Sequence, residues 1–400
     1  MNILITPSRL HGTVRIPASK SMAHRLLICA ALAEGTSVIS GVDMSRDITA
    51  TMDVLSAFGA SFRQEGSTIT VTGVGNARPQ AAVADCCESG STLRFLIPVA
   101  AALGIHTTFF GQGRLPQRPI TAYLRELTKK GVTFDYHNTM PFTIDGKLRS
   151  GVFELEGDVS SQYVTGLLFA LPLLDGDSEI RMLSKLESKP YVDLTIACLR
   201  HFGIAVQETE QGYAVAGGQQ YHACDLTVEG DYSQAAFFCV ANALGSDITL
   251  TNLNPESVQG DKKIVEIVRE MCYNREQGLP AGFTVDAADI PDLVPILAVL
   301  ATFGTAPSSI TGAHRLAIKE SDKVTATPDG LEIEPVEQLH GGTVDSCGDH
   351  RIAMCAAVAA TRCAGEVTIL HGECVEKSYP RFYEDYRQLG GIANVIVLES

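Results

Sequence analysis

The hydrophobic pattern of the chain repeats itself. Six stretches begin with a polar cluster, continue with mainly apolar residues and end near a glycine: 19–35, 89–104, 160–176, 230–245, 289–304 and 348–365. Polar capping residues and a terminal glycine are the expected boundaries of a helix. Because apolar residues occupy nearly every side of these segments, the pattern predicts six buried helices.

The six predicted helices are regularly spaced. Their starts are taken as Ser19, Gly90, Ser160, Asp231, Ile290 and Asp349. The steps between them are 71, 70, 71, 59 and 59 residues. This period is too long for a solenoid repeat and suits a small α/β repeat used six times. The shorter steps indicate that the fourth and fifth repeats have lost residues, near 272–283 and 323–331.

Strand-like segments with alternating β-branched residues, such as STITVT and DITLT, lie between the helices. Weaker amphipathic helices are predicted at 48–60, 120–131, 192–203 and 262–271. Each repeat is therefore predicted to contain helix, strand, helix and strand. Three repeats plus three repeats make an α/β protein of two similar domains, with a boundary near VEGD at 228–231.

Composition narrows the class of protein. A chain of 400 residues, 45% of them hydrophobic, is too long to fold around a single hydrophobic core, so two domains are expected. No window of 18 uninterrupted apolar residues suggests a membrane span. The start MNILITPSRLHG lacks the features of a signal peptide and favours a strand. The 11 cysteines are scattered without a CxxC pair, so neither zinc nor a disulfide framework is expected, and a reducing cytoplasm is favoured.

Charge points to a small anionic ligand. The net charge of −15 disfavours nucleic acid and anionic membranes as partners. The predicted helix starts nevertheless contain or adjoin most of the notable cations: Lys20, Arg25, Arg94, Lys189, Lys319, Lys323, Arg351 and Lys377. Free N–H groups and these cations suit phosphates and carboxylates if the starts converge on one cleft. The alternative is a purely structural repeat with solvated surface charges.

Ten motifs in order make the pattern specific. They are SKSMAHR, SGSTLRF, RLPQRPI, SSQYVTGLL, SKPYVD, EGDYSQAAFF, DIPDLVPILA, KESDK, CGDHRIAM and EKSYPRF. Together they resemble the EPSP synthase (3-phosphoshikimate 1-carboxyvinyltransferase) family over about residues 5–390. The resemblance implies the enolpyruvyl transferase fold, an inside-out α/β barrel with three βαβαββ-type repeats in each of two globular domains. It also implies transfer of the enolpyruvyl group of phosphoenolpyruvate to the 5-hydroxyl of shikimate 3-phosphate, on the pathway to chorismate.

The resemblance also implies the domain limits. Residues 18–229, here the N-terminal domain, would bind mainly shikimate 3-phosphate. Residues 1–17 and 230–400, here the C-terminal domain, would contribute phosphoenolpyruvate-binding and acid/base residues, with the active site in the cleft between the domains. A monomer in the cytoplasm, inhibited by glyphosate, is the family expectation.

Site residues follow from the same motifs. The resemblance assigns to shikimate 3-phosphate Lys20, Ser21, Arg25, Ser160, Ser161, Gln162, Ser188, Tyr191, Asp292 and Lys319. It assigns to phosphoenolpyruvate Lys20, Gly90, Arg94, Arg118, Gln162, Lys323, Arg351 and Lys377.

The chemistry requires two acid/base groups. We expect Asp292 to take the proton of the sugar hydroxyl, Glu320 to protonate C3 of phosphoenolpyruvate, and Lys20 to assist at the bridging or leaving oxygen. No metal or organic cofactor is expected, because phosphoenolpyruvate is already activated. The alternatives are that Asp292 caps a helix starting at Leu293, and that Glu320 is a surface partner of a neighbouring lysine.

Three departures from the family pattern stand out. Lys323 replaces an arginine, which exchanges a bidentate clamp for a point charge. Glu88 and Ser89 replace the usual Asn-Ala or Asn-Ser before Gly90. The helix and strands that follow KESDR in the family are expected to be largely absent, because VTATPDGLEIE is too short for them.

Rival activities fit less well. A UDP-N-acetylglucosamine enolpyruvyl transferase typically has a Lys-Asn pair and a reactive loop cysteine, whereas this chain has SKS and the cysteine-free GQGRLPQRPI. An RNA 3′-phosphate cyclase would need a nucleotide-linked histidine and a basic surface. A degenerate, anion-binding member of the fold is the remaining alternative.

Overall fold

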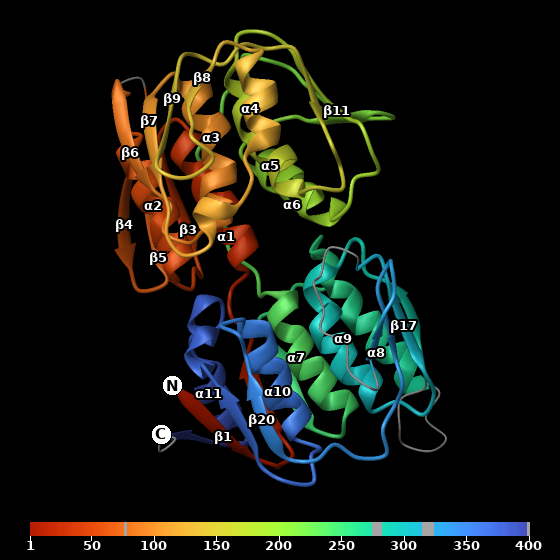
Figure 1. Cartoon of the computed structure of the whole chain (residues 1–400). Coiled ribbons are helices and arrows are strands. Elements are labelled where there is room, and N and C mark those ends of the chain that lie inside the picture. Colours follow the sequence, from red (N-terminus) through yellow and green to blue (C-terminus); the bar gives the residue numbers. More distant parts are fainter. Residues whose placement is uncertain (76–77, 274–281, 314–323, 398–400) are drawn as a thin grey trace. The chain divides into compact units, whose positions relative to one another are not determined.

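A computed structural model of the chain (Figure 1) describes residues 1–75, 78–273, 282–313 and 324–397. The chain forms two compact domains, residues 18–229 and residues 1–17 with 230–400. Each domain encloses a hydrophobic core of its own. None of the helices in these described ranges is long and apolar enough to span a membrane.

The N-terminal domain is built from eighteen helices and strands, with interspersed 3-10 turns, in an order that recurs. In chain order the helices and strands are α1 (Lys20–Leu32), β3 (Thr36–Ser40), α2 (Arg46–Ala57), β4 (Ser61–Glu65), β5 (Thr68–Thr72), β6 (Ala81–Asp85), α3 (Gly90–Leu103), β7 (His106–Phe110), α4 (Thr121–Thr128), β8 (Thr133–Asp135), β9 (Phe142–Asp145), β10 (Val152–Leu155), α5 (Ser161–Ala170), β11 (Ser178–Met182), α6 (Lys189–His201), β12 (Gln207–Thr209), β13 (Gly212–Val215) and β14 (Leu226–Thr227), with 3-10 turns η1 (Leu115–Gln117) and η2 (Leu171–Leu173).

Its three sheets share one topology. Their strand orders are β14-β3-β5-β4, β6-β7-β9-β8 and β10-β11-β13-β12. In each sheet the first pair is parallel and the other two pairs are antiparallel. A buried helix makes the crossover between the parallel strands, α3 between β6 and β7 and α5 between β10 and β11. This βαβαββ arrangement confirms the predicted fold class.

The C-terminal domain uses the same parts. Its elements are β1 (Asn2–Thr6), β2 (His11–Arg15), α7 (Tyr232–Ala243), β15 (Asp247–Thr251), η3 (Gly260–Lys262), α8 (Lys263–Tyr273), β16 (Thr284–Asp286), η4 (Pro291–Leu293), α9 (Val294–Thr302), β17 (Ser308–Thr311), β18 (Val324–Ala326), β19 (Leu331–Ile333), β20 (Gly342–Asp345), α10 (His350–Ala360), β21 (Val367–Leu370), η5 (Gly372–Lys377), α11 (Phe382–Gln388) and β22 (Ile392–Ile396).

Two strands from the beginning of the chain complete sheets of this domain. Strand β1 lies between β21 and β22 and is antiparallel to both, and β2 pairs in parallel with β15. The β15–β2 pair has no further strand within the described residues, in keeping with a shortened fourth repeat.

The fifth repeat corrects one expectation. The prediction that the strands after KESDK are largely absent was wrong, because β18 and β19 pair as an antiparallel hairpin inside VTATPDGLEIE. Strand β19 also pairs with β17, so the sheet order β16-β17-β19-β18 matches that of the complete repeats. Strands of three residues suffice here because a neighbouring strand already supplies one edge.

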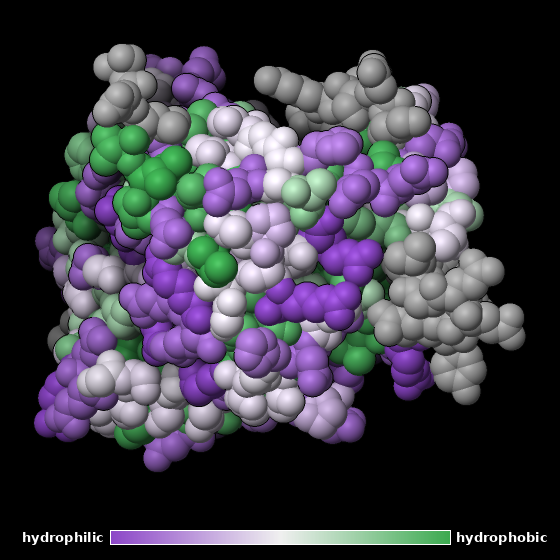
Figure 2. All heavy atoms as spheres, turned by 90° about the horizontal axis from the view of Figure 1, so that it is seen from below, coloured by the Kyte–Doolittle hydropathy of each residue, from purple (hydrophilic) through white to green (hydrophobic). Residues whose placement is uncertain are grey.

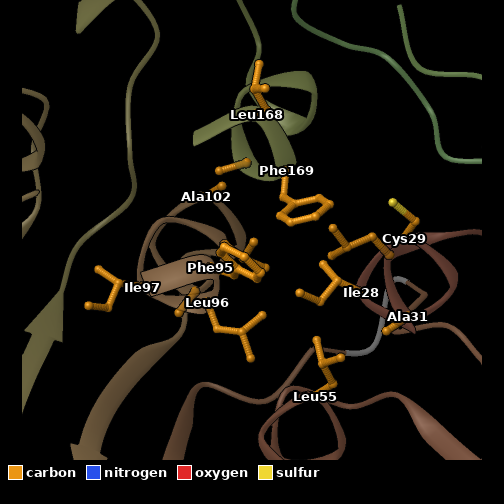
Figure 3. Close-up of a cluster of buried hydrophobic side chains, with 14 of the residues drawn as sticks. Ile28, Cys29, Ala31, Leu55, Phe95, Leu96, Ile97, Ala102, Leu168 and Phe169 are labelled. Atoms are coloured by element: carbon orange, nitrogen blue, oxygen red, sulfur yellow. The ribbon is translucent and has the colours of Figure 1, made fainter. Parts of the chain in front are cut away.

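Buried helices form the cores, as the apolar pattern predicted. In the N-terminal domain, Phe95 of α3 and Phe169 of α5 meet edge to face with ring centroids 5.7 Å apart, among Ile28, Leu55 and Leu168 (Figure 3). A Cβ at Gly166 would overlap the carbonyl oxygen of Arg94, so this glycine allows α5 to approach α3 closely. On the face shown in Figure 2, hydrophilic and hydrophobic residues are interspersed.

Candidate active site

Two almost wholly buried helices of the N-terminal domain present three polar side chains. Helix α3 is buried except for Ser91 and Arg94, and α5 is buried except for Gln162. These three side chains contact one another: Arg94 Nη1 donates to Gln162 Oε1 at 2.8 Å, and Gln162 Nε2 donates to Ser91 Oγ at 3.1 Å. Ser91 and Gln162 are the second residues of α3 and α5, where free N–H groups carry partial positive charge, and Arg94 is the fifth residue of α3.

Arg118 lies against the start of α3. A Cβ at Gly90 would overlap Nη1 of Arg118, so glycine is needed for the guanidinium to occupy this place. Loss of hydration and the nearby charge of Arg94 lower the pKa of Arg118. Within the described part of the chain, its side chain makes no hydrogen bond or ion pair, and in this sense it is uncompensated, although the charges of Asp47 and Glu88 act on it from a distance. Two positive charges, those of Arg94 and Arg118, thus lie close together, and this favours binding of an anion.

Lys20 has a carboxylate partner that the sequence did not indicate. As the first residue of α1, it pairs with Asp47 in the first turn of α2, with Nζ and Oδ2 2.9 Å apart and both side chains about a third exposed. Ser19 caps α1 by accepting from the backbone N–H of Met22. The only sequence signal for Asp47 was an acidic residue at a predicted helix start.

Arg25 is built into the domain. It is 3% exposed, and burial lowers its pKa to about 10. Its Nε donates to Thr195 Oγ1 at 2.8 Å, and Nη1 and Nη2 donate to the carbonyls of Ser21 and Tyr191 at 2.7 and 2.9 Å. The arginine thereby ties α1 to α6, and with it Ser21 to Tyr191.

Three further predicted serines lie at helix starts of the same domain. Ser160 caps α5 by accepting from the N–H of Gln162, and Ser161 is the buried first residue of that helix. Ser188, at the start of α6, is buried and has a left-handed backbone with φ of 57°.

The C-terminal domain brings together Asp292, Arg351 and Lys377. Arg351 in the first turn of α10 pairs with Asp292 of η4, with Nη2 and Oδ2 2.6 Å apart. Lys377 at the end of η5 donates to the carbonyl of Gly348, in the loop before α10. The N-cap position of α9 is taken by Leu293, which has no side-chain oxygen, so Asp292 is not the N-cap residue of that helix.

A buried carboxyl group beside this cluster escaped the sequence analysis. Asp261 of η3 is 4% exposed; its Oδ2 accepts from Ser233 Oγ, and its Oδ1 has no partner among the described residues. Burial and the nearby Asp292 charge raise its pKa to about 8. Burial likewise raises the pKa of Asp231, the cap of α7. The sequence signal that could have pointed to Asp261 was its place in the triplet QGD at 259–261, directly before the predicted amphipathic helix.

Three predicted residues, Lys319, Glu320 and Lys323, lie in 314–323, outside the described residues. Their positions relative to Asp292 stay predictions. In the ranges that are described, no group of three or more His, Cys, Asp or Glu residues is arranged to hold a metal ion.

Comparison with known proteins decides the family. The family model for EPSP synthase (3-phosphoshikimate 1-carboxyvinyltransferase) matches residues 4–386. The chain belongs to the EPSP synthase family. It is 42% identical to the 3-phosphoshikimate 1-carboxyvinyltransferase of Clostridium kluyveri over 97% of both chains, and 42% identical to that of Clostridium perfringens over 98% of both.

A solved structure of EPSP synthase from Acinetobacter baumannii matches with a TM-score of 0.82 at 25% identity, covering 98% of this chain and 100% of that one. The chain is thus a transferase of the EPSP synthase family. The family's reaction moves the 1-carboxyvinyl group of phosphoenolpyruvate to shikimate 3-phosphate in the shikimate pathway. The comparisons do not favour the UDP-N-acetylglucosamine alternative.

Proposed function

We propose that this chain forms 5-enolpyruvylshikimate 3-phosphate with the residues that the motifs assign. The N-terminal domain would bind mainly shikimate 3-phosphate through Ser160, Ser161, Ser188 and their neighbours. The C-terminal domain would supply acid/base groups and further cations. The observation that carries the proposal is the set of contacts among Arg94, Gln162 and Ser91 beside the uncompensated Arg118.

The N-terminal contacts support an anion site of defined shape. Gln162 links the start of α5 to Arg94, so a ligand there meets an amide and a guanidinium held in fixed positions. Arg118 and Lys20 would add charge for the phosphate and carboxylate of phosphoenolpyruvate. The anionic substrate would compete with Asp47 for Lys20.

The C-terminal contacts support acid/base work at Asp292. Its carboxylate would take the proton of the 5-hydroxyl as the new O–C2 bond forms, while Glu320 protonates C3. In the second step the C2–O bond to phosphate breaks, and Glu320 takes a proton back from the methyl group so that the C2=C3 bond returns. Arg351, now paired with Asp292, would also meet the charge of phosphoenolpyruvate with Lys377 and Lys323.

The test is release of phosphate that requires both shikimate 3-phosphate and phosphoenolpyruvate. We expect Asp292→Asn and Glu320→Gln each to lower kcat by about 100-fold or more, with binding of shikimate 3-phosphate retained. Asp289→Asn, an exposed residue of the same DIPD segment, is the matched control and should keep the rate. Unchanged rates in the first two variants would refute the assigned roles.

We also propose the cytoplasm as the compartment, because the cysteines described in the structure are free thiols and several are buried. Glyphosate is the inhibitor that we propose, acting where phosphoenolpyruvate binds beside Gly90. A monomer is the proposed state in solution.

A further inference from the structure

Tyr163 joins three elements of the proposed phosphoenolpyruvate site without being assigned to any substrate. It is the third residue of α5, directly after Gln162, and is only 2% exposed. Its hydroxyl donates to the carbonyl oxygen of Pro119, the residue that follows Arg118. The buried helix is thereby bonded to the loop that carries the uncompensated arginine.

The ring of Tyr163 supports a second cation. The guanidinium carbon of Arg94 lies 5.3 Å from the ring centroid, within cation–π distance. Tyr123 of α4 packs edge-on against the same ring, with centroids 4.8 Å apart and planes at 83°. The hydroxyl of Tyr123 lies 2.8 Å from the carbonyl oxygen of Arg94 and 3.0 Å from that of Tyr163, so its single proton is shared between the two carbonyls and restrains the backbone at both residues.

The Arg118 loop has few other attachments at its far end. Its beginning is held by a bond from Gln112 N–H to the carbonyl of Cys87, and Leu115 is buried. Between residues 116 and 119, the backbone bonds described in the structure are internal to the loop, apart from the one from Tyr163. The hydroxyl of Tyr163 therefore restrains the segment in which the Arg118 backbone lies.

We infer that Tyr163 is a positioning residue for phosphoenolpyruvate binding: its hydroxyl sets the place of Arg118 and its ring sets that of Arg94. This inference rests on the proposed function, since it assumes that these two arginines bind phosphoenolpyruvate. Tyr163 touches no reacting atom in this role. Its loss would weaken binding of one substrate and leave the chemistry largely intact.

The test variant is Tyr163→Phe, which keeps the ring beneath Arg94 and removes the bond to Pro119 together with the interaction of the hydroxyl with Arg94. We expect the KM for phosphoenolpyruvate to rise about fivefold, as for loss of one hydrogen bond, with kcat and the KM for shikimate 3-phosphate within about twofold of wild type. The matched control is Tyr221→Phe, because the Tyr221 hydroxyl donates to the carbonyl of Phe169 at 2.8 Å inside the same core. Tyr221→Phe should lower the melting temperature and leave both KM values unchanged.

A double-mutant cycle identifies the route of the effect. In an Arg118→Lys background, Tyr163→Phe should raise the KM for phosphoenolpyruvate by much less than it does in wild type, because the guanidinium group that Tyr163 positions is absent. An equal rise in both backgrounds, or equal kinetics for Tyr163→Phe and Tyr221→Phe, would overturn the inference.

Amide hydrogen exchange separates this inference from the proposed function. Tyr163→Phe should speed exchange at Gln117 and Arg118, and Tyr221→Phe should not. Faster exchange in a protein that releases no phosphate from the two substrates would leave the restraint in place and refute the proposed function. Unchanged exchange in an active enzyme would refute the restraint alone.

Discussion

The two domains begin their buried helices with different side chains. In the N-terminal domain, serines cap α1, α3 and α5. In the C-terminal domain, Asp231 and Asp349 cap α7 and α10. Both residue types satisfy the first N–H groups of a helix, but only the carboxylate adds a full negative charge.

This difference separates two tasks within one repeated architecture. Serine caps are neutral, so they do not offset the partial positive charge at the helix start or the charge of cations such as Arg118, and both can interact with a ligand. Aspartate caps offset that charge, and with Asp261 and Asp292 they concentrate carboxyl groups around Arg351. The helix starts of the N-terminal domain therefore favour an anion, whereas the C-terminal domain combines cations such as Arg351 with carboxyl groups that could transfer protons.

The strongest challenge to this comparison is removal of the uncompensated cation. Arg118→Ala should raise the KM for phosphoenolpyruvate about 100-fold, because loss of a hydrogen bond between two charged groups costs roughly 3 kcal/mol. Steady-state phosphate release measures it. Arg114→Ala, an exposed arginine four positions earlier in the loop, is the control and should stay near wild type. Equal losses in both variants would show that the loop needs only positive charge.

A smaller effect is expected from converting one cap to the type found in the other domain. Ser160→Asp keeps an oxygen that caps α5 but adds negative charge where the phosphate of shikimate 3-phosphate is proposed to bind, so its KM should rise about tenfold. Ser160→Asn is the neutral control of the same shape and an equally good cap. If the two variants have the same KM, the charge of the cap is irrelevant.

The smallest effect concerns stability and pH. In the N-terminal domain, burial lowers the pKa of His24 to about 3 from its ordinary 6.5. Below pH 6.5 the unfolded chain gains a proton that the folded chain refuses, so stability falls as pH drops toward 3. Asp261 behaves oppositely: its folded pKa of about 8 exceeds 3.8, so stability falls as pH rises from 4 toward 8.

Melting temperatures check these opposite slopes. Between pH 5 and pH 8 the melting temperature of Asp261→Asn, relative to that of wild type, should rise by about 3 °C. The reason is that an amide does not titrate in this range, so the variant does not lose stability as the carboxyl group of wild type does. The melting temperature of His24→Gln, relative to that of wild type, should rise as the pH falls from 7 to 4. Parallel melting profiles for a variant and wild type would show that the group does not titrate differently in the folded chain.

Local signals explain how much could be predicted from the sequence. Ser160 and the glycine at 176 mark both ends of one buried segment, and the same kind of mark recurs along the chain, so the helices and the fold class were accessible. The β18–β19 hairpin was missed because the prediction considered only the short length of the segment VTATPDGLEIE. Its PDG turn sequence and the pairing of β19 with β17 explain why short strands persist.

Partners in space were not accessible. Lys20 meets Asp47 across 27 positions, and Arg94 meets Gln162 across 68, only because packed helices bring them together. A motif names such residues without naming what they touch. Asp261 carried no local mark of its raised pKa either, since the cause is burial beside Asp292.

The place of β1 and β2 has a consequence for synthesis on the ribosome. Residues 18–229 are contiguous and have all their strands once they have emerged. Strand β1, made first, needs β21 and β22 near the other end of the chain as its neighbours. At about 5–20 residues per second, translation from β1 to the end of β22 takes roughly 20 to 80 s. During that interval the nascent amino end has unpaired edges and depends on chaperones, or on its own short length, to avoid a wrong partner.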